Sequence, residues 1–92
     1  MNINKFRDTK LTNDLEKEEL VYRELIKKNN APSNAFCNLG IIYAKTGRVE
    51  EAVSLFKKYI HLEPTSSIAY NNLALIFIKQ KKYNEAIKNF LI

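Results

Sequence analysis

The residue types that carry out chemistry in proteins are few in this chain, and they are scattered. His61 is the single histidine and Cys37 the single cysteine, so the chain has neither a cluster of zinc ligands nor an internal disulfide. Acidic side chains gather at residues 16–19 and 50–51, but at spacings typical of solvated helical faces rather than of a general acid paired with a base. Neither glycine belongs to a phosphate-binding motif. We therefore predict a protein that is not an enzyme and that has no metal or cofactor site.

Composition indicates one small folded domain. The chain has 92 residues, of which 46% are hydrophobic, enough for a packed core but only for modest stability. The net charge of +5 comes from lysines and arginines scattered along the chain. Such a balance is typical of a solvated basic surface, and it also favours an acidic partner or nucleic acid.

The sequence has neither the pattern typical of a signal peptide nor that of a membrane span. Residues 1–8 contain no apolar core of the kind that a signal peptide needs, and no apolar run approaches the ~18 residues that span a bilayer. A single cysteine fits a reducing compartment. We expect a cytoplasmic protein with no membrane association.

The elements that would position any site repeat along the chain. The segment from Phe36 to Tyr43 aligns without a gap on the segment from Tyr70 to Phe77, and the same offset places residues 51–53 on residues 85–87. We call this offset, about 34 residues, the repeat period. Self-similarity at a period of 20–50 residues indicates a stacked repeat array, in which each unit buries its apolar face against its neighbours. Function is then expected on a surface made by stacking.

The first part of the chain is predicted to be a flexible arm followed by one helix. Residues 1–11 are polar and lack periodicity, which predicts the arm. Asn13, with Glu16 as its capping-box partner, predicts the start of a helix that ends near Lys28 within the segment 12–30.

Four further helices follow from apolar residues spaced by three and four. They are predicted from a cap at Ser33 or Asn34 to about Lys45, over 49–62, from a cap within 65–67 to about Lys79, and from near Tyr83 to the still apolar residues 90–92. The β-branched residues follow helical spacing, so no strand is predicted. Short links favour antiparallel neighbours, and the fold is predicted to be all-α.

These residues resemble the tetratricopeptide repeat (TPR) family, whose helix-turn-helix unit has the same period as this chain, about 34 residues. The first predicted repeat, residues 33–66, matches the family pattern at Phe36, Leu39, Gly40, Tyr43, Ala52, Phe56 and Pro64. The second, truncated repeat, residues 67–92, matches it at Tyr70, Leu73, Phe77, Ala86 and Phe90, with Ala74 in place of the glycine. The resemblance implies antiparallel hairpins stacked as a short right-handed α-solenoid of about five helices.

Small residues in this pattern predict close contacts between helices. Gly40 and Ala74 are expected where the two helices of each hairpin meet. Gly47 suits the left-handed residue after a helix. Lys81 stands at the same register, so the second turn is expected either to carry the cost of a left-handed backbone or to adopt another shape. Tyr59 replaces the alanine that the family prefers, and we expect a small neighbour from the next helix, Ala69, to compensate.

The first predicted helix has two interpretations. Counting back one repeat period from the segment 52–60 puts Glu18, Tyr22, Leu25 and Ile26 in register with it, as in the second half of a degenerate repeat. Glu18 stands where that reading needs a small residue. The other interpretation is a simple N-terminal cap.

Carried over by register, the resemblance implies a concave groove lined by the first helix of each repeat. Its predicted residues are Asn34, Cys37, Asn38, Ile41, Lys45, Ile68, Asn71, Asn72, Leu75 and Lys79. Asn38 and Asn72 share a register position and are expected to form a ladder of carboxamides along an extended peptide. Ile41 and Leu75 are expected to contact apolar side chains of that peptide. The lysines favour an acidic partner, and Cys37 is expected in the groove as a small, partly apolar residue.

We therefore predict a non-catalytic protein–protein interaction module, or scaffold, that binds an extended peptide or partner segment. Family members that bind the C-terminal carboxylate of chaperones use a lysine and an asparagine four residues apart in the first helix of a repeat. Those places hold Cys37 and Ile41 in one repeat and Asn71 and Leu75 in the other, so binding of chaperone tails is disfavoured. One alternative is an RNA-binding helical repeat, although nucleic acid is disfavoured by the length of the repeat period. Another is a self-assembling fragment of a longer TPR protein, forming a homo-oligomer through its C-terminal helix.

Overall fold

The chain folds into helices joined by short turns. The computed structural model describes the backbone of residues 3–29 and 31–90 and the side chains of residues 14–29 and 31–89. Across these residues there are five helices and no strand, so the predicted all-α class is confirmed. The helices are α1 (Ile3–Lys27), α2 (Ser33–Lys45), α3 (Val49–Leu62), α4 (Ser67–Lys79) and α5 (Tyr83–Phe90).

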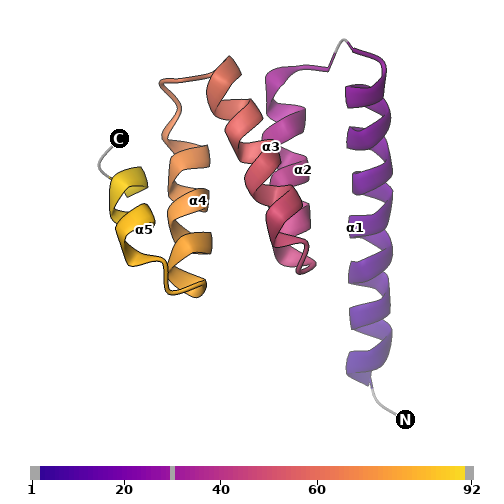
Figure 1. Cartoon of the computed structure of the whole chain (residues 1–92). Helices are drawn as coiled ribbons and strands as arrows, with labels where there is room; N and C mark the ends of the chain where they lie inside the picture. Colours follow the sequence, from indigo (N-terminus) through magenta and orange to yellow (C-terminus); the bar gives the residue numbers. More distant parts are fainter. Residues whose placement is uncertain (1–2, 30, 91–92) are drawn as a thin grey trace.

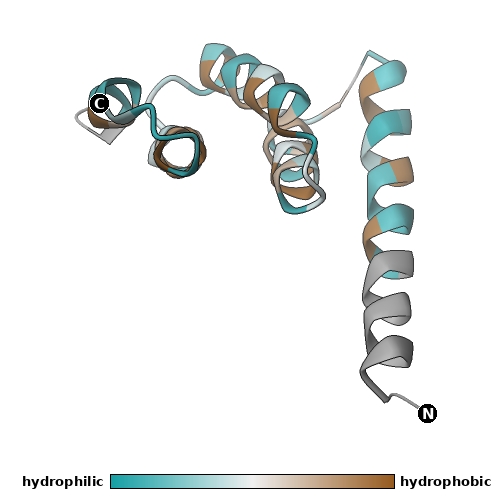
Figure 2. Cartoon of the chain, turned by 60° about the horizontal axis from the view of Figure 1, so that its bottom comes forward, coloured by the Kyte–Doolittle hydropathy of each residue, from teal (hydrophilic) through white to brown (hydrophobic). Residues whose placement is uncertain are grey.

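The helices pair as two consecutive hairpins, α2 with α3 and α4 with α5, and α1 lies alongside α2 (Figure 1). The hairpins meet where α3 packs on α4, and α2 also contacts α4. Apolar residues occur on more than one side of α1 (Figure 2). Accordingly Tyr22 and Ile26 pack against the core, whereas Leu20 and Val21 are exposed.

The start of α1 corrects the sequence prediction. The helix begins at Ile3 rather than at Asn13, so residues 3–11, predicted as an arm without periodic structure, are helical. Residues 1–2 of that predicted arm lie outside the described residues. No glycine or proline precedes Pro32, and nothing in the covalent backbone therefore interrupts a helix that extends to the N-terminal side of Asn13. At its other end α1 closes through Asn29, whose φ of 65° is left-handed.

The predicted caps of α2 are also wrong, although the helix bounds agree with the prediction. The N-cap residue is Pro32, and no side chain caps the helix. Ser33 is the first helical residue, and its hydroxyl donates a hydrogen bond of 2.9 Å to Oε1 of Glu63 at the end of α3. The serine thus joins the two ends of the hairpin instead of capping its own helix.

The turns inside the two hairpins have the same backbone shape despite different residues. Gly47 has a φ of 83° and Lys81 a φ of 61°, so of the two outcomes left open for the second turn the structure shows the left-handed one. In the first turn the Arg48 amide donates to the Tyr43 carbonyl at 2.8 Å, and in the second the Lys82 amide donates to the Phe77 carbonyl at 2.7 Å. The left-handed conformation costs a non-glycine residue about 1–2 kcal/mol.

The core of the first hairpin is a close contact between a glycine and an aromatic ring. A Cβ added at Gly40 would lie 2.9 Å from Cε1 of Phe56, and Phe56 is fully buried. Ala52 and Ala74 have no exposed surface, which confirms that small residues are needed where helices meet. Tyr59 and Ala69 are buried in the same core cluster, as predicted for the junction between the hairpins.

Candidate functional site

The predicted groove contains a hollow between α2 and α4, which we call the inner hollow. Its volume is about 380 Å³, and it is lined by Ile41, Ala44, Lys45, Val49, Asn72, Leu75, Ile76, Lys79 and Gln80. The structure thus brings together five of the predicted groove residues. The lining includes two lysines and no acidic residue.

The repeat period explains how these side chains meet. Ile41 and Lys45 stand four residues apart on α2, and Leu75 and Lys79 repeat that spacing on α4. Residues four apart share a helix face, so each helix presents one apolar and one cationic side chain in the same order. Ile41 is half-buried, Leu75 is 52% exposed, and both lysines are exposed. The inner hollow is therefore an accessible apolar surface next to two positive charges.

The two asparagines at the shared register position have different partners. The Asn38 amide nitrogen donates to the Tyr22 hydroxyl of α1 at 3.3 Å, whereas that of Asn72 donates to the Ile68 carbonyl of its own helix at 2.9 Å. Tyr22 precedes Phe56 by one repeat period, and a phenylalanine offers no hydroxyl to Asn72. The two carboxamides are therefore not equivalent in the structure, because α1 already engages one of them, and the predicted ladder along a peptide stays a prediction.

Cys37 does not lie in the groove. Only 4% of its surface is exposed, and it belongs to the core cluster with Leu39 and Tyr43. Burial raises the pKa of its thiol, since the apolar surroundings disfavour the thiolate. The remaining predicted groove residues are exposed but are not part of the inner hollow: Asn34, Ile68 and Asn71.

Sequence reasoning missed four residues of the inner hollow. Ala44 and Ile76 each adjoin a predicted residue on its helix, and a wider helical stripe would have included them. Val49 and Gln80 lie at the turns, where the family pattern of the first helix gave no expectation. Turn residues therefore close the hollow at one end.

An ion pair attaches α1 to the turn of the first hairpin. The guanidinium of Arg48 donates to both carboxylate oxygens of Glu19, one of them at 2.9 Å, and lies 4.2 Å from the centre of the Tyr43 ring. Hydrogen bonding to Arg48 lowers the pKa of Glu19, and hydrogen bonding to Glu19 raises the pKa of Arg48. Arg23 also bonds Glu19, at 3.3 Å. This geometry holds α1 against α2 through charge as well as packing.

Metal sites and membrane spans require particular groupings of residues. The described residues include no group of three or more histidine, cysteine, aspartate or glutamate side chains placed to hold a metal ion. In the same part of the chain, no helix combines the length and apolar character that crossing a bilayer requires.

The chain was compared with models of protein families and with curated proteins. Two models, both described as tetratricopeptide repeat, match residues 33–66 and residues 55–88. Together they span residues 33–88, more than half of the chain. The match to residues 33–66 covers α2 and α3. The match to residues 55–88 begins inside α3 and continues through α4 into α5. No curated protein matches the chain.

Proposed function

This chain belongs to the tetratricopeptide repeat family, and from that premise we propose that it binds an extended segment of a partner protein in the inner hollow. Repeats of this family are generally protein–protein interaction modules and typically non-catalytic scaffolds. The proposal assigns the binding surface to α2 and α4, which contact each other and present matched side chains.

The observation that carries the proposal is the pairing of apolar and cationic side chains in one accessible hollow. An extended peptide alternates its side chains between two sides, so residues of one kind fall on one face. Apolar side chains on that face would pack on Ile41 and Leu75. The carboxylates on the opposite face would be attracted by Lys45 and Lys79, whose long side chains are exposed beside the apolar surface. The preferred ligand is therefore a short extended segment in which apolar and acidic residues alternate.

The two kinds of contact contribute differently. Removing apolar surface from water supplies most of the free energy, about 25 cal/mol for each Å² buried. The exposed lysines mainly raise the association rate and exclude basic segments, and salt screens them. We expect affinity to fall as NaCl rises from about 0.05 to about 0.5 M without being lost.

Fluorescence anisotropy with short labelled peptides tests the proposal. One probe alternates leucine with glutamate, and its control alternates leucine with lysine. Saturable binding of the glutamate peptide alone is expected. Leu75→Asp should abolish that binding, because it places a carboxylate in the apolar surface. Ile68→Asp is the matched control: Ile68 is 53% exposed on the same helix but is not part of the inner hollow.

Two results would contradict the proposal. One is equal loss of binding in the Leu75 and Ile68 variants, which would locate the ligand elsewhere on α4. The other is a glutamate peptide that shows no saturable binding to the folded protein. The RNA alternative is tested in the same anisotropy assay with labelled single-stranded RNA. Saturable binding of the RNA at low salt would support that alternative.

A further inference from the structure

A second hollow lies between α1 and α3, and we call it the outer groove. Its volume is about 680 Å³, and α1, α2 and α3 all line it. Among the described residues α1 and α3 each pack on α2 but have no close backbone contact with each other. The residues of α2 that line the outer groove, Leu39 and Tyr43, stand two positions before Ile41 and Lys45 of the inner hollow. Residues two apart on a helix face opposite sides, so the two hollows are separate sites.

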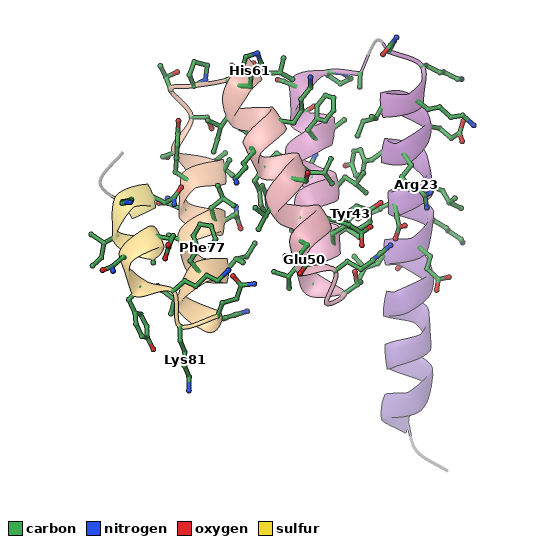
Figure 3. All side chains as sticks on the ribbon, viewed as in Figure 1. Arg23, Tyr43, Glu50, His61, Phe77 and Lys81 are labelled. Atoms are coloured by element: carbon green, nitrogen blue, oxygen red, sulfur yellow. The ribbon has the colours of Figure 1, made fainter. Side chains whose placement is uncertain are left out.

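The floor of the outer groove is apolar. Leu39 and Tyr43 of α2 form the floor and are nearly fully buried, and Ile26 of α1 packs against the same core cluster. The two sides of the groove, which we call its banks, are formed by α1 and α3. Leu20 of α1 is 60% exposed and Leu55 of α3 is half-buried. Tyr43 points from α2 toward α1 (Figure 3). The groove therefore leaves apolar side chains of α1 and α3 open to a ligand, on either side of a floor that α2 fills with buried apolar residues.

The banks carry opposite charges. Arg23, Lys27 and one carboxylate, Glu24, line the groove from α1, so this bank is net positive. Glu50 and Glu51 line it from the start of α3 and make that bank negative. Among the described side chains, Lys27, Glu50 and Glu51 form no ion pair, whereas Arg23 shares Glu19 with Arg48. A ligand with an acidic flank on one side and a basic flank on the other would match both banks.

The groove is particular to this pair of helices and does not follow from the repeat. Moving one repeat period along the chain replaces Leu20 by Ser54 and Leu55 by Asn89. The same step replaces Glu50 by Asn84. The corresponding interval between α3 and α5 thus lacks both the apolar banks and one of the acidic side chains. Only the first interval combines the features that a ligand would need.

We propose that the outer groove binds an amphipathic helix of a partner protein. The apolar stripe of this helix packs on Leu20 and Leu55, its acidic flank meets Lys27, and its basic flank meets Glu51. A helix fits because it presents an apolar stripe with a charged flank on each side, which matches an apolar floor between two charged banks, whereas an extended segment has only two opposite faces. Insertion of an amphipathic helix between two others is an established mode of recognition. The proposal does not depend on binding in the inner hollow.

Three helical peptides serve as probes. All carry leucine at positions i, i+3, i+4 and i+7, and they differ only in their flanks: glutamate on one side and lysine on the other, glutamate on both, or lysine on both. Fluorescence anisotropy is expected to rank the mixed-charge peptide first. A helix can enter a groove in either direction, so exchanging the two flanks is not a control and the uniformly charged peptides are used instead.

Substitutions in the groove locate the binding. Leu20→Asp is expected to weaken the mixed-charge peptide by about tenfold or more, the usual loss when a central anchor is removed. Ser54→Arg fills the groove from an exposed position of α3 and needs no change in the core, so it tests the site even if the Leu20 variant is unstable. Leu75→Asp, in the inner hollow, should leave the affinity unchanged.

A charge substitution tests the assignment of the banks. Lys27→Glu makes the α1 bank more acidic and should shift the preference toward the peptide with two lysine flanks. Lys57→Glu is the matched control: it changes the net charge equally from an exposed position of α3 outside the groove.

The outcomes are distinct. Loss with Leu20→Asp and Ser54→Arg, together with a preference shift confined to Lys27→Glu, supports the proposal. Absence of saturable binding of the mixed-charge peptide to the folded protein overturns it. So does a preference shift of equal size in the Lys27 and Lys57 variants, which would reflect net charge alone. Loss with Leu75→Asp instead would place the helix in the inner hollow and overturn this assignment while supporting the other.

Discussion

The two hairpins share a backbone plan but differ in how tightly their helices meet and in how their turns are built. In the first hairpin Gly40 has no room for a methyl group beside Phe56, whereas the second has a buried Ala74 at the matching position. The first turn uses Gly47 for its left-handed residue, and the second adopts the same conformation with Lys81. The repeat therefore specifies the path of the chain, while the side chains at matched positions set the local stability.

The largest expected effect comes from removing the ring that fills the first hairpin. Phe56→Ala should lower the free energy of unfolding by about 3–5 kcal/mol, because a fully buried aromatic side chain leaves a cavity. Urea denaturation followed by circular dichroism measures this loss. Leu75→Ala, at an exposed position of α4, is the control and should change stability little. Losses of similar size in the two variants would contradict the buried contact.

The next test adds one methyl group to the first hairpin. Gly40→Ala gains roughly 1 kcal/mol of helix propensity, but overpacking against Phe56 costs about 1–3 kcal/mol. We expect a net loss of stability of about 1 kcal/mol. The double variant Gly40→Ala with Phe56→Leu should lose less than the sum of the two single losses, since the smaller side chain leaves space for the methyl. Strict additivity would show that the two residues are not in contact.

Exchanging the turn residues should change stability with opposite signs. Gly47→Lys is expected to cost about 1–2 kcal/mol, the strain of a left-handed non-glycine residue. Lys81→Gly relieves that strain but makes the unfolded chain more flexible, so a gain of roughly 0.5–1 kcal/mol is expected. Thermal melting of both variants measures the pair. A melting temperature that shifts in the same direction for both would mean that the turns differ in shape.

The smallest expected effect concerns the ion pair that the second hairpin lacks. Val53 and Lys82 stand one repeat period after Glu19 and Arg48 and cannot form such a pair. Hydrogen bonding to Arg48 lowers the pKa of Glu19 in the folded state, so its stabilisation is present above the unperturbed pKa of about 4.3. It is lost as the pH falls from there through the lowered value. The contribution is expected to be about 1 kcal/mol or less.

Comparing the unsubstituted protein with the Glu19→Gln variant isolates the contribution of the Glu19 charge to stability. The difference in unfolding free energy between the two proteins should be present at neutral pH and shrink in acid, whatever the other carboxyl groups contribute. A difference that stays constant with pH would contradict a role for the Glu19 charge.

Much of the fold could be predicted because it depends on local patterns. The bounds of α3, the left-handed Gly47 and the small Gly40 follow from helical spacing and from the repeat. For Lys81 the repeat left two turn shapes open. The start of α1 could not be predicted in the same way. Asn13 has the sequence of a cap, but the helix continues through it, and no glycine or proline interrupts the chain there.

The candidate site was less predictable, because its details depend on contacts between distant residues. Register correctly grouped Ile41 with Leu75 and Lys45 with Lys79. It could not show that Tyr22 engages the Asn38 side chain, since the matching Phe56 has no hydroxyl. Nor does register find the outer groove, which depends on residues of α1 that the repeat does not share.

The central claim is that the inner hollow between the matched faces of α2 and α4 is the surface that binds an extended partner segment. Its most direct test is an amide NMR titration of the isotopically labelled chain with the peptide of alternating leucine and glutamate. We predict saturable shifts that centre on Ile41, Lys45, Leu75 and Lys79. Shifts that centre instead on residues of α1 and α3, or their absence at saturating peptide, would contradict the claim.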